Sequence, residues 1–126
     1  MTEKAIMAER EIVNIDALKA RVDGDAELLA EITGMFLERS SEIIASIERA
    51  IISQDAGSLE TSAHCLRGYL VSLHAERASE VALQLEIKGR LNDCVGVRYL
   101  FTKLEEEVER LEPILAQYGS KACNSQ

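Results

Sequence analysis

The chain has 126 residues, of which 47% are hydrophobic and 4% aromatic, and it contains no tryptophan. This length suits one domain with an aliphatic core. Its net charge of −8 excludes the basic surface that a phosphate backbone requires, so no nucleic-acid partner is expected. No apolar run is long enough to span a membrane and the N-terminus lacks a signal segment, so we expect a cytoplasmic protein without a membrane partner.

The first predicted elements precede and include the longest helix of the chain. Residues 1–13 are typical of a leader, and Asp16 is a candidate cap for a short helix that ends near Gly24. Apolar residues recur at helical spacing from Asp25 onward, which predicts an amphipathic helix of about 28 residues.

The second half of the chain is also predicted to be helical. Asp55 is a candidate N-cap for a helix with one apolar seam, formed by Leu59, Ala63, Leu66, Leu70 and Leu73. Residues 75–90 predict the next helix, with Gly89 near its end. A last helix is expected from a cap at Asp93 to a stop at Gly119, and its acidic run at 105–109 is expected to face solvent.

These elements predict an all-α fold, because there is a single proline and no sustained strand-type alternation. Short connections favour an antiparallel up-down-up-down four-helix bundle with a short additional N-terminal helix. We expect the domain to span residues 14–118, and residues 119–126 to form a disordered tail.

The three cysteines do not suggest a metal site or a disulfide framework. Cys65, Cys94 and Cys123 are odd in number, and their spacing matches no zinc pattern. Free thiols in a reducing compartment are the better interpretation, and no metal site is predicted.

The candidate functional residue is His64, within the stretch AHCLRGYL at residues 63–70. On a helix it lies one step off the apolar seam, at the border of the buried stripe. Gly68, one turn later, costs the helix about 1 kcal/mol relative to alanine but leaves the approach to the imidazole open. Arg67 brings a cation near the ring. This combination suits an anionic group, and a phosphoryl group is the obvious candidate.

The stretch HCLRG at 64–68 resembles the short pattern His-x-Leu-Lys-Gly of the histidine-containing phosphotransfer (HPt) domains. The segments SLETSAH before it and LHAERASEVALQLE after it match the flanks of that family in spacing. The stretch IDALKARVDGDAELLAEITGMFLE at 15–38 is similar to the opening of these domains. The resemblance covers about residues 15–118.

The resemblance implies that His64 accepts a phosphoryl group from a receiver-domain aspartate, or from a kinase, and passes it to another receiver. Arg67 takes the place of a lysine that offsets phosphate charge, and Gly68 admits the active site of the receiver. Glu86 lies where the family often has Glu or Gln, which bonds one ring nitrogen of the histidine. We expect the partner to dock over the residues around this patch, which include Glu60, Thr61, Val71 and Arg90.

The implied partners are a response-regulator receiver domain and a hybrid sensor histidine kinase. No cofactor is expected, since Mg²⁺ belongs to the receiver, and no small-molecule catalysis is expected of the chain alone. A monomer is expected. Arg90 is open to two interpretations, a solvated charge at a helix end or part of the docking rim.

The sequence departs from the family pattern at several places. Arg67 replaces the lysine, Tyr69 and Leu70 replace small residues, and His74 stands where glycine is common. The bulk at positions 69 and 70 keeps an alternative open, a module that docks a receiver or kinase and is not itself phosphorylated. A purely structural bundle and an enzyme with its own cavity are less favoured, because the sequence shows neither an extended apolar exterior seam nor a catalytic constellation.

Overall fold

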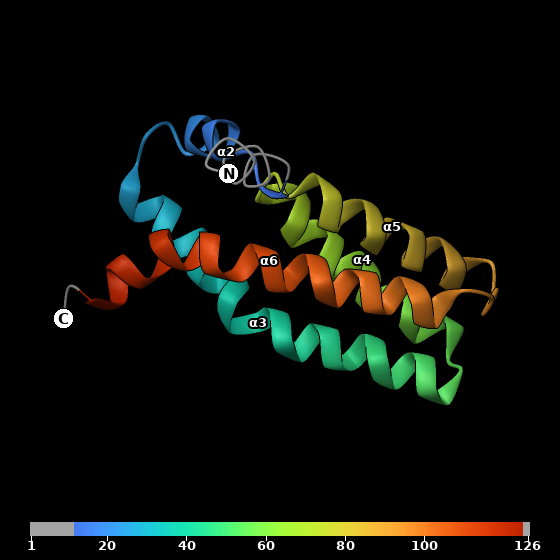
Figure 1. The fold of residues 1–126 in the computed structure, drawn as a ribbon. Coiled ribbons are helices and arrows are strands. Elements are labelled where there is room, and N and C mark those ends of the chain that lie inside the picture. Colours follow the sequence, from blue (N-terminus) through green and yellow to red (C-terminus); the bar gives the residue numbers. More distant parts are fainter. Residues whose placement is uncertain (1–11, 125–126) are drawn as a thin grey trace, which may run out of the picture.

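The computed structural model describes residues 12–124, with side chains through residue 118. Every regular element in this range is a helix, which confirms the all-α prediction. The helices carry the labels of Figure 1 and run as follows: α2 Ile15–Arg21, α3 Ala26–Ser53, α4 Ala56–Ser72, α5 Glu76–Arg90 and α6 Val97–Asn124.

The four long helices form a bundle in which successive helices reverse direction (Figure 1). Helix α3 packs against α4 and α6, and α5 also packs against α4 and α6, so each helix has two principal neighbours. The aliphatic seams predicted for the helices meet in the core, where Leu66, Leu70 and Leu104 are fully buried with Phe36 and Phe101. This arrangement leaves one long side of α4 facing solvent.

The N-cap predicted at Asp55 is confirmed, and the long helix predicted from Asp25 begins where expected. The Asp25 carboxylate accepts hydrogen bonds from the backbone N–H groups of Glu27 and Leu28, and α3 has the 28 residues expected. The Asp55 carboxylate caps α4 through the N–H of Ser58. For α2, however, the cap is Asn14 rather than Asp16, because the Asn14 side chain accepts from the N–H of Ala17.

The last helix differs from its predicted bounds at both ends. It begins at Val97 because Gly96 has a left-handed φ of 74°, which a helix cannot pass through, and Asp93 instead accepts from Val95 N in the preceding turn. It continues to Asn124, past the stop predicted at Gly119. A single glycine costs a helix only about 1 kcal/mol, and no proline follows it.

The N-terminal boundary is described only in part. Residues 1–11 of the predicted leader lie outside the described residues, as do residues 125–126 of the predicted tail. The last two leader residues, Ile12 and Val13, are buried in the core. The backbone N–H of Asn14 donates to the carbonyl of His74, which ties the start of α2 to the turn between α4 and α5.

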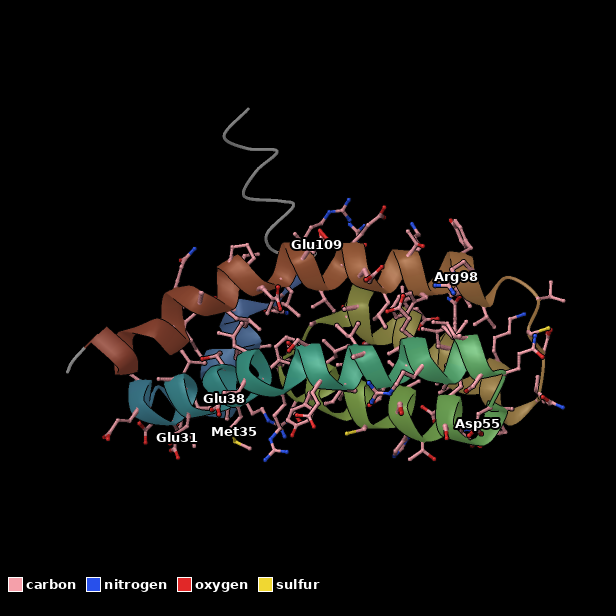
Figure 2. All side chains as sticks on the ribbon, turned by 90° about the horizontal axis from the view of Figure 1, so that it is seen from below. Glu31, Met35, Glu38, Asp55, Arg98 and Glu109 are labelled. Atoms are coloured by element: carbon pink, nitrogen blue, oxygen red, sulfur yellow. The ribbon has the colours of Figure 1, made fainter. Side chains whose placement is uncertain are left out.

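The outer faces of α3 and α6 are largely acidic. Figure 2 shows Glu31 and Glu38 projecting from α3, and Glu109 projecting from α6. The prediction for the acidic run at 105–109 is wrong at Glu107, which is buried and pairs with Arg77 and Arg110. Within the described residues, no helix is long and apolar enough to cross a membrane, and no group of His, Cys, Asp and Glu has the arrangement of a metal site.

Candidate functional site

The solvent-facing side of α4 carries a stripe of residues spaced three and four apart, Thr61, His64, Gly68 and Val71. The His64 side chain is 66% exposed, which is more than its predicted place at the border of the core suggested. Val71 is also exposed, at 51%. The Thr61 hydroxyl donates to the carbonyl of Gly57, so it is held against its own helix.

Glu86 of α5 is the residue that orders this patch. Its side chain is only 4% exposed, and three side chains donate to its carboxylate. His64 Nδ1 lies 3.0 Å from Oε2, Arg67 Nε lies 2.7 Å from Oε1, and Arg90 Nη2 lies 3.0 Å from Oε2. Burial of a carboxylate is tolerated here because each oxygen has at least one cationic or polar donor.

The hydrogen bond from Arg67 lowers the pKa of Glu86, and the contact with His64 lowers it further, against the opposing effect of burial. The carboxylate is therefore ionised at neutral pH and can only accept hydrogen bonds. It follows that in the neutral imidazole the proton lies on Nδ1, which donates to Glu86 Oε2. The other nitrogen, Nε2, carries the lone pair and makes no hydrogen bond to any described residue.

Arg67 has N–H groups beside this ring that are not bonded to any described residue. Its Nη2 lies 3.3 Å from His64 Nδ1, but a protonated Nδ1 cannot accept a hydrogen bond from it. Within the described part of the chain, only its Nε has an acceptor that it can use, the carboxylate of Glu86. The terminal N–H groups of the guanidinium are thus available to an anion that binds next to the imidazole.

Arg90 joins the two helices below the histidine. Its Nε donates to Glu60 Oε2 of α4 at 3.1 Å, while its Nη2 donates to Glu86 within α5. Its side chain is 54% exposed and has two carboxylate partners, so both interpretations that the sequence left open, a solvated charge and a part of the docking rim, stay predictions. Glu60 and Arg90, expected as separate docking residues, form one ion pair at the edge of the patch.

The glycines of α4 and α5 serve different purposes. A Cβ added to Gly68 would meet nothing within 4 Å, so the chain itself does not require glycine there. A Cβ at Gly89 would lie 2.6 Å from Glu60 N and 2.8 Å from the Ala56 carbonyl oxygen. Gly89 therefore allows the close approach of α5 to α4 that brings Glu86 and Arg90 to the histidine.

Two of the departures from the family pattern do not lie on the open patch. Leu70 is fully buried in the core, and Tyr69 packs against Phe36 of α3, with ring centroids 6.4 Å apart. Leu70 therefore makes no contact with a docking partner in this fold, whereas Tyr69 stays partly exposed and the effect of its bulk stays a prediction. His74 has a left-handed φ of 58° after the end of α4, a conformation that favours glycine.

Sequence reasoning missed the role of Gly89 and the burial of Glu107. Nothing in the local sequence distinguishes Glu107 from its acidic neighbours, and only the facing Arg77 explains its position. Gly89 did carry a signal, since a glycine inside a helix next to a charged residue has a cost that needs a reason. The structure does bring together His64, Arg67, Gly68 and Glu86, as the sequence suggested.

Three comparisons with known proteins bear on this arrangement. The family model described as "Hpt domain" matches residues 31–114. The crystal structure of histidine-containing phosphotransfer protein B (HptB) from Pseudomonas aeruginosa PAO1 is similar in fold, with a TM-score of 0.80 and 18% sequence identity. The likeness covers 87% of this chain and 96% of that one. A search of curated protein sequences found no match.

Proposed function

Because the chain belongs to the Hpt domain family, we propose that it is a phosphorelay intermediate that carries a phosphoryl group on Nε2 of His64. The donor is a phosphorylated receiver-domain aspartate, or a kinase, and the acceptor is the aspartate of another receiver. The observation that carries this proposal is the bond from His64 Nδ1 to buried Glu86, which leaves Nε2 unprotonated and exposed.

The transfer step follows from the same contacts. The lone pair of Nε2 attacks phosphorus, the P–N bond forms, and the P–O bond to the donor aspartate breaks, which regenerates its carboxylate. Positive charge develops on the imidazole and is stabilised by the ionised Glu86, which continues to accept a hydrogen bond from the Nδ1–H group. Arg67 offsets the charge of the phosphoryl oxygens with its free N–H groups. The reverse sequence delivers the group to the next receiver.

The docking surface that we propose includes the exposed stripe of α4 and the adjacent part of α5. Val71 and Ile87 are exposed apolar residues on these helices, and Gly68 leaves a gap for the partner. Thr61 and the Glu60–Arg90 pair form its polar edge. The receiver supplies Mg²⁺ and its own aspartate, so the chain itself requires no cofactor. We expect a monomer that acts in the cytoplasm.

The experiment that tests the proposal is transfer of labelled phosphoryl from phosphorylated receiver domains of the source organism. The expected label on the wild-type chain is labile in acid and stable in base, as a phosphoramidate is. His64→Gln should abolish it. His74→Gln is the matched control, because this second histidine lies outside the Glu86 contacts, and it should retain the label.

The alternative is a module that docks receivers without accepting phosphate. It predicts that receivers bind the wild-type chain and His64→Gln equally, and that neither becomes labelled. The burial of Leu70 and the packing of Tyr69 against Phe36 weaken the steric argument for this alternative, because neither side chain contacts the imidazole.

A further inference from the structure

A cavity of about 540 Å³ opens at the end of the bundle away from α2, where the turn between α3 and α4 faces the loop between α5 and α6. Figure 2 shows Asp55 and Arg98 together at this end. The floor is apolar, and its residues come from three helices. They are Ala50, Ile51, Ala56, Leu59 and Val97. A cavity of this size with an apolar floor and a few polar groups is typical of a small-molecule site.

The rim contains two carboxylates, but both already accept hydrogen bonds within the chain. Asp55 accepts from the N–H and the hydroxyl of Ser58, and Asp93 accepts from Val95 N and Lys88 Nζ. The bonds from Ser58 lower the pKa of Asp55, and the bond from Val95 N lowers that of Asp93. These carboxylates are therefore committed to the ends of α4 and α5.

The cation on the rim that has donors to spare is Arg98. Its Nη1 lies 3.7 Å from Glu48 Oε2, too far for a hydrogen bond, and its guanidinium lies over the ring of Phe101. Among the described residues, none accepts a hydrogen bond from the Arg98 guanidinium. Lys88, the second cation on the rim, is bound to Asp93.

We propose that this cavity binds an amphipathic anion. The apolar body of the ligand lies on the floor near Leu59 and Val97, and its carboxylate, sulfonate or phosphate group accepts hydrogen bonds from Arg98. The site is separate from the proposed phosphorylation site and does not depend on it.

The test uses two probes that share one apolar body. 8-Anilinonaphthalene-1-sulfonate carries a sulfonate, and N-phenyl-1-naphthylamine has nearly the same rings without charge. We expect the folded wild-type chain to bind the sulfonate about tenfold more tightly than the neutral probe. Arg98→Gln should remove this difference. Arg49→Gln, which changes an exposed arginine outside the cavity, should retain it.

Two cysteines whose side chains the structure describes as exposed can be used to locate the bound probe. Cys94 lines the cavity, whereas Cys65 lies on α4 outside it. Saturating sulfonate should slow alkylation of Cys94 by iodoacetamide and leave the rate at Cys65 unchanged, as measured by peptide mass spectrometry. Ala56→Leu, which adds bulk at the cavity wall, should weaken binding and reduce this protection.

Three outcomes would overturn the proposal. The first is absence of binding by the sulfonate, and the second is binding that leaves Cys94 unprotected, which would place the probe elsewhere. The third is equal affinity for both probes, or a preference for an amphipathic cation, which would show that Arg98 does not select the ligand. Phosphotransfer through His64 is measured separately, so its failure would not be confused with these results.

Discussion

Two buried glutamates on neighbouring helices have similar surroundings but differ in the hydrogen bonds of their carboxylate oxygens. Glu86 of α5 and Glu107 of α6 each accept hydrogen bonds from two arginines, and each side chain is 4% exposed. Around Glu86 both oxygens are bonded and a histidine completes the set. Around Glu107 both arginines bond Oε2, while Oε1 has no hydrogen-bond partner in the described part of the chain.

The comparison shows that a buried ion-pair cluster does not by itself indicate a functional site. Both clusters connect helices, and burial of a charge has a desolvation cost in both. Only the Glu86 cluster includes a histidine, and it holds Nδ1 of an exposed imidazole. The feature that distinguishes the two clusters is thus the exposed ring of His64, with the guanidinium of Arg67 beside it.

The largest expected effect on phosphotransfer comes from replacing Glu86 by methionine, with the same replacement at Glu107 as the control. Glu86→Met should slow phosphotransfer to His64 about 100-fold, because the ring loses the group that fixes its tautomer and stabilises its charge. Glu107→Met should leave the transfer rate unchanged. Single-turnover transfer from a phosphorylated receiver measures both. Equal losses in the two variants would show that the clusters act only through stability.

The effect of Glu107→Met on stability is expected to be small. Glu107→Met should leave the free energy of unfolding within about 1 kcal/mol of wild type or raise it, because an apolar group replaces a carboxylate with one unbonded oxygen. Urea denaturation measures this change. A loss of more than about 3 kcal/mol would show that the Arg77 and Arg110 contacts stabilise the bundle strongly.

Gly89→Ala should destabilise the chain by about 1–3 kcal/mol, because its Cβ would meet backbone atoms of α4 that cannot move aside locally. If α5 shifts away instead, Glu86 and Arg90 move with it, and phosphotransfer should slow as well. Thermal denaturation and transfer assays on the same sample measure the two effects. An unchanged melting temperature would contradict the close approach of the two helices.

Acid unfolding should depend on Glu86. Its pKa is lowered in the folded chain, chiefly by the hydrogen bond from Arg67, so the folded state binds this proton less readily than the unfolded state. The resulting stability is present above the ordinary glutamate pKa of 4.5, which applies to the unfolded chain, and is lost as the pH falls through the folded pKa. Glu86→Gln should therefore lose less stability than wild type between about pH 5 and pH 3. Denaturant titrations at a series of pH values measure the free energy of unfolding of both proteins. An equal loss of this free energy in wild type and Glu86→Gln as the pH falls would argue against this prediction.

The smallest expected change in stability is at Gly68. Gly68→Ala should raise the free energy of unfolding by up to about 1 kcal/mol, since alanine is the better helix former and its Cβ meets no atom of the chain. The same substitution should weaken receiver binding. Calorimetric unfolding and a binding titration with one receiver measure the two effects. A variant that is both more stable and fully competent to bind would remove the docking role of this glycine.

Much of the fold could be predicted because it depends on local patterns. The apolar spacing of α3 and the cap predicted at Asp55 are properties of a few adjacent residues, and they placed the starts of α3 and α4 correctly. The start of α6 could not be predicted in this way, because Asp93 bonds the preceding turn and Gly96 adopts a left-handed φ. The end at Asn124 was missed because glycine only weakens a helix.

The candidate site was predictable where residues share one helix. Spacing alone placed Arg67 and Gly68 beside His64, whereas Glu86 came from the family resemblance. The double bonding of Arg90, the close approach at Gly89 and the burial of Glu107 depend on contacts between helices. Such contacts are set by the packing of the whole bundle, which no local pattern encodes.

The empty space above Gly68 has a consequence for how relay pathways stay separate. A Cβ added there would meet no atom of this chain, and under the proposed function it would project toward a receiver that approaches His64. A larger residue at position 68 could then be matched by a smaller residue in one receiver, while other receivers are excluded by steric clash. One substitution in each protein would in this way set up an orthogonal signalling pair.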